Sequence, residues 1–135
     1  MKFLQLLTII TVLFANNAYS SNHERVIHYS PDKPTSIQNA LDIFESKLAL
    51  VTKIMTKPKI DDYDMEDVHE ISYSLESAVT YLIENDDKRF KLLQKLEMVV
   101  LDLHNFSEER QLNMLKISYK KVKVNYKKVK RSYGG

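Results

Sequence analysis

The 135-residue sequence contains no cysteine. A disulfide, a lipid-modified cysteine and a covalent c-type haem attachment are therefore excluded. The two glycines both lie at the C-terminus, so the sequence has no glycine-rich loop that could cradle a phosphate. It also has no nucleophile elbow and no metalloprotease histidine pair. Stability must come from packing alone, and we expect a protein that is not an enzyme.

The first residues have the composition of a secretory signal peptide. Lys2 precedes an uncharged apolar run over 3–15, and the small-residue site Ala18-Tyr19-Ser20 follows. The run is shorter than the roughly 20 apolar residues that a membrane-spanning helix needs. We therefore predict a signal peptide over 1–20 that is cleaved after Ser20, with an uncleaved N-terminal anchor as the alternative. The expected location is periplasmic or secreted.

The residues after the signal peptide change character at Thr35. Two prolines and no helical period mark 21–35 as an extended leader. The first helix is predicted at 36–56, with Thr35 and Gln38 forming a capping box. Pro58 stops this helix, because proline lacks an amide hydrogen and clashes with the preceding turn.

The second and third helices are predicted from apolar residues at three- and four-residue steps. Asp64 is the expected N-cap of a second helix that ends near residue 84. The third helix is expected at 87–104. Its inward side is predicted to hold Phe90, Leu93, Leu96, Val100 and Leu103.

The fourth helix has the most regular period in the sequence. Ser107 is its expected cap. Apolar residues then alternate steps of three and four at Leu112, Leu115, Tyr119, Val122, Tyr126, Val129 and Tyr133. The tyrosines share the valine face, so we expect them in a core rather than stacked on nucleic-acid bases. A strand reading remains open for 122–124, where apolar and charged residues alternate, but it explains fewer positions.

Four helices joined by short connections predict an all-α fold. The expected architecture is an up-down-up-down four-helix bundle that forms one domain over 36–133. The cleaved signal peptide and the extended leader precede it. In such a bundle the second and fourth helices lie on a diagonal.

Charge is distributed unevenly along the sequence. Residues 61–87 hold ten acids and no Lys or Arg, whereas 111–135 hold seven Lys, one Arg and no acid. Solvated faces that suit the helix macrodipoles are the simplest interpretation. The alternatives are a basic patch for an anionic membrane surface or envelope protein, and self-association through opposite faces. Nucleic acid is disfavoured because the protein is expected to be exported. The patch comprises Lys116, Lys120, Lys121, Lys123, Lys127, Lys128, Lys130 and Arg131.

A second group of polar residues lies on the second predicted helix. His69, Tyr73 and Glu76 fall on one flank of its apolar stripe and form a polar ribbon beside the core. The ordinary interpretation is a buried hydrogen-bond network at a helix–helix edge. The ribbon could also orient a ligand or a metal ion.

The same ribbon suggests a metal site. If the second and third helices are antiparallel, His69 and His104 lie within roughly a turn of one another. Together with Asp62, Asp64 or Asp102, the two histidines could bind zinc or another divalent ion.

Cleavage after Ser20 would create another candidate site. The new terminus would begin Ser21-Asn22-His23, so its free amine, two backbone nitrogens and the imidazole could form a square-planar nitrogen set. Such a set suits Cu(II) or Ni(II). A histidine at this position also arises by chance, and no other cofactor is expected.

Haem is a further alternative for a four-helix exported protein. The soluble four-helix b-type cytochromes use a Met from the first helix and a His from the last. Here Met55 lies at the end of the first predicted helix, and the fourth contains no His. The ligand arrangement of that cytochrome type is therefore absent.

Two stretches resemble a known family. They are ERVIHYSPDKPTSIQNALDIFESKLALV, residues 24–51, and DMEDVHEISYSLESAVTYL, residues 64–82. They are similar to small exported proteobacterial helical proteins with an E-R-V-x-H-[FY] start, a K-P-x-x-[TS] step and an [IV]-H-x-[IL]-[ST]-Y-[ST]-L-E-x-A segment. The resemblance implies a periplasmic helical protein and no established activity, and the Lys-rich fourth helix departs from the more acidic relatives. The matching positions here are Arg25, His28, Lys33, Pro34, His69, Tyr73 and Glu76.

These features favour a periplasmic or secreted helical-bundle protein that acts by binding. Its expected partner is an anionic membrane surface or another envelope protein. The rival interpretation is a carrier of Cu, Ni or Zn, or of haem.

Overall fold

The structure, a computed structural model, describes residues 30–134. This part of the chain is all-helical, as predicted, and contains no strand, so the strand reading of 122–124 is wrong. None of its helices is long and apolar enough to cross a membrane. The signal peptide and most of the leader lie outside the described residues. The elements are α1 (Ile37–Met55), α2 (Asp62–Asn85), the 3-10 turn η1 (Asp87–Arg89), α3 (Phe90–Glu108) and α4 (Leu112–Ser132).

The start of α1 differs from the prediction by one residue. Ser36 is extended, with φ at −157°, and its hydroxyl accepts a hydrogen bond from the Asn39 amide at 3.0 Å. The expected capping box of Thr35 and Gln38 is therefore wrong. Gln38 instead donates its side-chain amide to Asp42 at 2.9 Å. Ser36 directly precedes the first helical residue, so its side chain reaches the unpaired backbone amides of the first turn.

The N-cap of α2 lies three residues before the predicted one. Asp61 is the N-cap, and it forms a capping box with Asp64, since each side chain accepts a hydrogen bond from the other residue's backbone amide. The prediction that Asp64 is itself the N-cap is wrong. Asp64 also accepts a hydrogen bond from Lys57, and this bond and that from the Asp61 amide lower the pKa of Asp64.

Helix α3 ends one turn later than predicted, at Glu108. Ser107 therefore lies inside α3, fully buried, and donates its hydroxyl to the His104 carbonyl at 2.7 Å. The prediction that it caps α4 is wrong, and α4 begins after Gln111 without a side-chain cap. Phe90 is also not inward, since its side chain is 43% exposed. It is the first residue of α3, because a 3-10 turn replaces the first helical turn that was predicted. The other predicted inward residues of α3 are buried.

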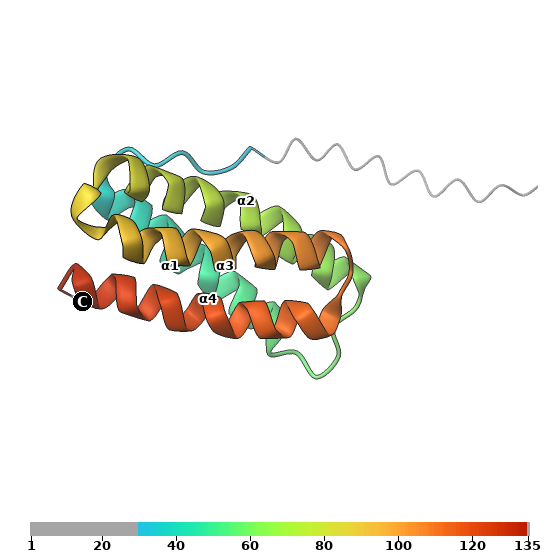
Figure 1. The fold of residues 1–135 in the computed structure, drawn as a ribbon. Helices are drawn as coiled ribbons and strands as arrows, with labels where there is room; N and C mark the ends of the chain where they lie inside the picture. The colour runs from blue at the N-terminus through green and yellow to red at the C-terminus, as the bar shows by residue number, and fades with distance from the viewer. Residues whose placement is uncertain (1–29, 135) are drawn as a thin grey trace, which may run out of the picture.

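The core lies between consecutive helices, with α1 packed on α2, α2 on α3 and α3 on α4. Figure 1 shows the chain reversing direction at each of the three connections. The predicted face of α4 points into this core: Tyr119 is 6% exposed and Tyr126 5%. The Tyr126 ring stacks on Phe44 of α1 with 4.5 Å between the ring centroids. The regular period of α4 therefore reflects packing, as expected.

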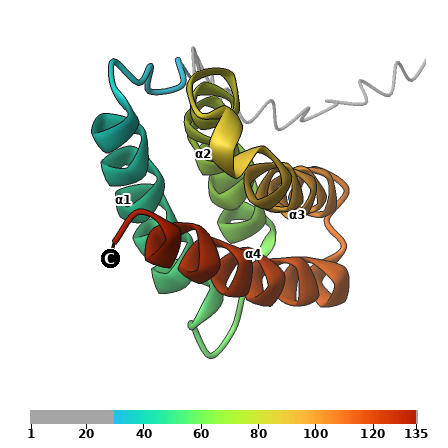
Figure 2. The same cartoon turned by 60° about the vertical axis from the view of Figure 1, so that its left-hand side comes forward.

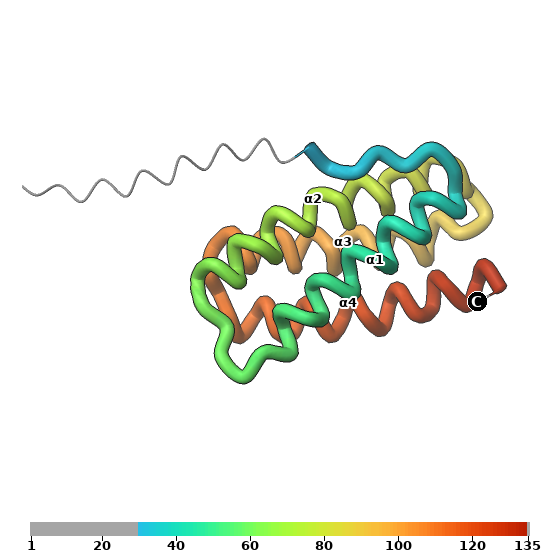
Figure 3. Tube along the Cα trace, turned by 180° about the vertical axis from the view of Figure 1, so that it is seen from behind, coloured from blue at the N-terminus to red at the C-terminus, as the bar shows by residue number. Residues whose placement is uncertain are grey.

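Helices α1 and α4 approach one another less closely than the three consecutive pairs. Figures 2 and 3 show α1 lying obliquely to α4 instead of alongside it. Long side chains bridge the two helices, since the Tyr119 hydroxyl donates to Thr52 at 3.1 Å and the Tyr126 hydroxyl to the Leu41 carbonyl at 3.2 Å. A square bundle with four equal neighbouring pairs does not describe this arrangement.

The described end of the leader lies against α2, as Figures 1 and 3 show. The Asp32 amide donates to the Ser74 hydroxyl at 3.1 Å, and the Asp32 carbonyl accepts from Ser77 at 2.8 Å. The Asp32 carboxylate pairs with Lys47 of α1 at 2.9 Å. These contacts fix the segment that enters α1.

Candidate metal centre between α2 and α3

Two histidines from different helices meet at the interface of α2 and α3. His69 lies on α2 and His104 on α3, and their rings pack edge to face with 4.7 Å between the centroids. Each side chain is 14% exposed. Ser72, one turn after His69, places its hydroxyl 2.9 Å from the His104 Nδ1. The sequence-based prediction that antiparallel packing brings the two histidines together agrees with this geometry.

Carboxylates approach the Nδ1 atom of each ring. Glu66 Oε1 lies 3.7 Å from the His69 Nδ1, and Glu76 Oε1 lies 2.7 Å from the His104 Nδ1. A ring that donates its Nδ1 hydrogen to a carboxylate keeps a lone pair on Nε2, which is the arrangement of metal-binding histidines. Glu76 is close enough to orient the His104 ring in this way, whereas 3.7 Å is too long for a hydrogen bond between the His69 Nδ1 and Glu66.

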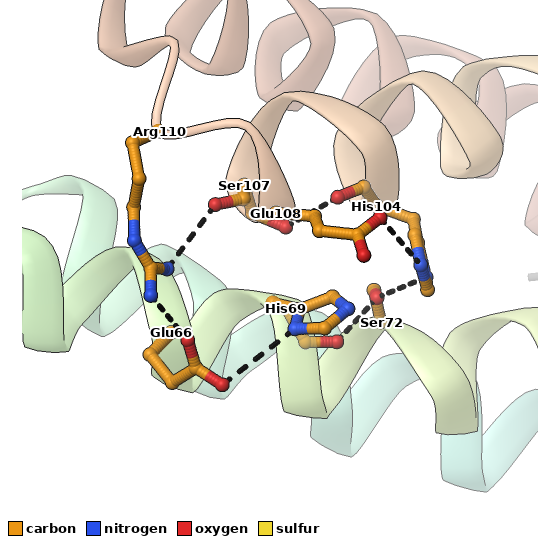
Figure 4. A network of polar contacts seen from close by, with 7 residues as sticks. All are labelled: Glu66, His69, Ser72, His104, Ser107, Glu108 and Arg110. Carbon is orange, nitrogen blue, oxygen red and sulfur yellow. Dashed lines mark hydrogen bonds and ion pairs between the residues drawn. The ribbon is translucent and has the colours of Figure 1, made fainter.

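The Nε2 side of the cluster holds a third carboxylate. Glu108 Oε2 lies 3.9 Å from the His104 Nε2, and Figure 4 shows the Glu108 carboxylate above the His69 ring and facing His104. One ligand atom from each of these three residues lies within 4.8 Å of the other two. The His69 Nε2 is buried and has no hydrogen-bond partner among the described residues. Two imidazoles and one carboxylate form a donor set that suits zinc.

Glu76 lies where the surrounding protein restricts water. Burial raises the pKa of its carboxyl, and the neighbouring His104 and His69 offset this only in part. Tyr73 closes the same side of the cluster, with its ring centroid 5.2 Å from that of His69 and 4.8 Å from that of His104. The predicted polar ribbon of His69, Tyr73 and Glu76 is thus one wall of the cluster.

An ion pair links the cluster to the turn between α3 and α4. Arg110 pairs with Glu66, the carboxylate that faces the His69 Nδ1 (Figure 4). Arg110 also donates to the Ser107 carbonyl at 3.3 Å. Its backbone is left-handed, with φ at 57°, a conformation that costs a non-glycine residue roughly 1–2 kcal/mol. Backbone strain of this kind is often kept where a side chain is needed at that place.

The left-handed residue ends α3 in a defined motif. The Gln111 amide donates to the Phe106 carbonyl at 2.9 Å and the Arg110 amide to the Ser107 carbonyl at 3.3 Å. This pair of bonds is a Schellman motif, which usually has glycine where Arg110 stands. The motif places the end of α3 at Glu108, so the third carboxylate still lies on the helix that carries His104.

The structure assigns other residues to the cluster than the sequence-based prediction did. The carboxylates beside the histidines are Glu66, Glu76 and Glu108, not Asp62, Asp64 or Asp102. Glu76 belongs to the predicted polar ribbon, and two spacings in the sequence could have identified the other two. Glu66 stands three residues before His69, and Glu108 four residues after His104, so each pair shares a helix face. Glu108 was missed because the third helix was predicted to end at 104.

The remaining predicted sites lie elsewhere or outside the described residues. Ser21, Asn22 and His23, together with Arg25 and His28, belong to the part of the chain that the structure does not describe. Met55 is buried in the core at the end of α1, as expected from its place in the period. All eight cations of the predicted basic patch on α4 are exposed. Among the described residues, the ion pair of this patch joins Lys130 to Glu45 at 2.6 Å.

One family model covers both the helical fold and the histidine cluster. The chain is a member of a family of unknown function, DUF6746, whose family model matches residues 1–127. This range includes α1, α2, α3 and most of α4, and therefore every residue of the histidine cluster. Neither the comparison with curated proteins nor that with solved structures gave a match.

Proposed function

We propose that this protein is an exported, non-enzymatic helical protein that binds one divalent transition-metal ion between α2 and α3. The ligands are the Nε2 atoms of His69 and His104 and the carboxylate of Glu108. The observation that carries the proposal is the His69 Nε2, which is buried without a partner on the side where Glu108 and His104 gather. Leaving such a group unpaired costs about 1–3 kcal/mol, and a bound ion would remove that cost.

Zinc fits this donor set best. Zinc takes imidazole nitrogen and carboxylate oxygen at about 2.0–2.2 Å in tetrahedral geometry, with water in a fourth position where the protein supplies three ligands. Ligand atoms around such an ion lie roughly 3.3 Å apart. The His104 Nε2 and Glu108 Oε2 are 3.9 Å apart, and the Glu108 side chain is 61% exposed. Rotation of this exposed side chain can shorten the distance to the His104 Nε2.

The carboxylates behind the rings support the same role. Glu76 lies 2.7 Å from the His104 Nδ1 and Glu66 lies 3.7 Å from the His69 Nδ1, so both favour rings that present Nε2. Loss of such supporting groups typically lowers metal affinity by about 10–100-fold. Cu(II) and Ni(II) also bind imidazole, and the proposed N-terminal site at Ser21, Asn22 and His23 suits them better than zinc. The α2–α3 site does not resemble a haem site of the four-helix cytochrome type, because α4 contains no His.

The test is zinc titration of the natively processed protein by isothermal calorimetry. We expect one zinc ion per chain, and an affinity that falls at least about tenfold in His69→Gln and in His104→Gln. His28→Gln is the matched control, since this histidine lies in the leader outside both candidate metal sites and the substitution should not change zinc binding. Circular dichroism checks that each variant is folded. Unchanged zinc binding in the folded double variant H69Q/H104Q would remove the proposal.

Export is part of the proposal and has its own test. We propose one small exported domain with an up-down-up-down order of helices. It would carry a signal peptide over 1–20 and have a periplasmic or secreted location. Intact-mass measurement of the protein from the cell envelope should show a chain that begins at Ser21. A mass that includes Met1 would mean that the N-terminal anchor is retained.

A second candidate role is contact with an anionic partner of the envelope through α4. One observation favours it: of the eight exposed cations on this helix, Lys130 is the one with an ion pair among residues 30–134. Like charges three and four residues apart repel one another on a helix, so this surface is costly unless something anionic covers it.

A further inference from the structure

The oblique arrangement of α1 and α4 leaves a groove between them. Its volume is about 490 Å³. The groove is separate from the histidine cluster, since it is lined by residues of α1 and α4 and the cluster lies on α2 and α3. The residues that matter here are Leu48 and Ala49 on α1 and Lys123, Tyr126, Lys127 and Lys130 on α4.

The floor of the groove is apolar and fixed. Tyr126 is held by its stacking on Phe44 and by its hydrogen bond to the Leu41 carbonyl. Leu48 lies beside it and is 9% exposed. Ala49 is exposed and ends at Cβ, so it leaves space above this floor. The groove is therefore formed before any ligand arrives, which lowers the cost of binding.

One wall of the groove is basic. Lys123, Lys127 and Lys130 stand at steps of four and three residues, which places them on one side of α4. Lys130 pairs with Glu45, and the Lys123 ammonium lies 4.8 Å from the centre of the Tyr119 ring. Lys127 has no ion pair among the described residues. An occupant with carboxylates would neutralise this wall and be steered toward it.

We propose that this groove binds an amphipathic α-helix of a partner protein, with acidic residues along one edge of its apolar stripe. The inference deepens the second candidate role of α4 and does not depend on the metal site. An apolar stripe with residues at steps of three and four would set its side chains on Tyr126 and above Ala49. Acidic residues one turn apart would then face Lys123 and Lys127, since Lys130 is already paired with Glu45, which also lines the groove.

Two other occupants match the groove less well. A membrane surface could neutralise the lysines, but it has no protruding side chain to reach Leu48 and Tyr126, which are at most 9% exposed. A second copy of this chain offers acidic residues on α2, but the apolar side of α2 is already buried in its own core. A separate helix with free apolar side chains satisfies both the floor and the wall.

The experiment uses a fluorescent acidic peptide of about 20 residues, long enough to form a helix, with leucines at steps of three and four and glutamates on the flank. Its affinity for the natively processed protein is measured by anisotropy. We expect Lys123→Glu combined with Lys127→Glu to weaken binding at least about tenfold. The matched control is Lys121→Glu combined with Lys128→Glu, which makes the same charge change on α4 away from the groove and should weaken binding by no more than about threefold.

A second pair of variants tests the apolar floor without changing charge. Ala49→Phe fills the groove and should abolish peptide binding, whereas Ser46→Phe adds the same side chain to an exposed position of α1 outside the groove and should not. Equal effects of the two lysine pairs, or equal effects of the two phenylalanines, would overturn the groove proposal.

A second assay uses vesicles of phosphatidylcholine with phosphatidylglycerol, to distinguish binding to an acidic helix from binding to an anionic membrane. Binding to the peptide but not to the vesicles is the expected result. Binding to vesicles alone would overturn the helix proposal and leave the anionic-partner role of α4 in place, and binding to neither would end both. Zinc titration of the same variants reports on the α2–α3 site independently.

Discussion

His69 of α2 and His104 of α3 meet edge to face, and each turns its Nδ1 toward a carboxylate of α2. Glu66 lies one turn before His69 and Glu76 two turns after it, so α2 supplies both supporting groups. Helix α3 contributes Glu108 on the opposite, Nε2 side. The Nδ1 side of the cluster thus faces the carboxylates of α2, and the Nε2 side is where we propose that the ion binds.

The first prediction concerns Glu108. Glu108→Gln should lower zinc affinity by about 10–100-fold, because the amide oxygen is a neutral and weaker ligand than the carboxylate. Glu109→Gln is the matched control: it removes the same charge from the neighbouring exposed position, which bonds to Gln111 and not to the cluster. Calorimetric titration of both variants distinguishes a ligand from a general effect of negative charge. Equal affinities in the two variants would show that Glu108 is not a ligand.

The second prediction concerns the left-handed Arg110. Arg110→Gly relieves a strain of roughly 1–2 kcal/mol and loses an exposed ion pair worth about 0–1 kcal/mol. We therefore expect the free energy of unfolding to rise slightly or stay unchanged. Zinc affinity should nevertheless fall severalfold, because Glu66 loses Arg110, one of the groups that hold it beside His69. Urea unfolding and zinc titration of the same sample measure both effects. Higher stability with full zinc affinity would show that Arg110 does not support the site.

The third prediction is a pH dependence that centres on Asp86. Burial alone would raise the pKa of Asp86, but hydrogen bonds from Tyr133, at 2.6 Å, and from Arg89, at 2.8 Å, outweigh it and lower that pKa. A carboxyl whose pKa is lower in the folded state stabilises the fold above its unfolded pKa of about 4. That stability should be lost as pH falls below this value.

Asp86→Ala tests this dependence. The substitution leaves the Tyr133 hydroxyl without its acceptor and removes one acceptor of Arg89, which still donates to Ser132. It should cost about 1–3 kcal/mol at neutral pH. The difference between the variant and the wild type should shrink on acidification, because the wild type loses the charged carboxylate as well. Urea unfolding at a series of pH values measures it. A constant difference across the acidic range would contradict the assignment.

The sequence predicts the helices best where apolar residues alone determine them. The face of α4 from Leu115 to Val129 was predicted correctly because it is buried without interruption. The meeting of His69 and His104 followed from one assumption, the antiparallel packing of consecutive helices. Polar side chains at helix ends were harder to predict, because several neighbouring residues can serve as caps.

The end of α3 shows why part of the site could not be predicted. A Schellman motif is recognised in a sequence by its glycine, and here Arg110 takes the left-handed position. Ser107 is a residue type that favours helix starts, but a serine can also donate to a carbonyl in the preceding turn, as Ser107 does to His104. The absence of a glycine and the presence of this serine together led to a predicted end of α3 that is too early. Glu108 was thereby assigned to a connection and not to the histidine face.

The last prediction separates the two contributions of Tyr126 to the contact between α1 and α4. Tyr126→Phe keeps the ring stacked on Phe44 and removes the hydrogen bond to the Leu41 carbonyl, so it should cost about 1 kcal/mol in the free energy of unfolding. Tyr126→Ala removes the ring as well and should cost about 3–5 kcal/mol, since a cavity remains in the core. Chemical denaturation followed by circular dichroism gives both values. The two helices are joined largely through side chains, so the ring should account for most of the loss in Tyr126→Ala. If Tyr126→Ala costs less than about 1 kcal/mol more than Tyr126→Phe, the value of one buried methylene, the ring does not hold the two helices together.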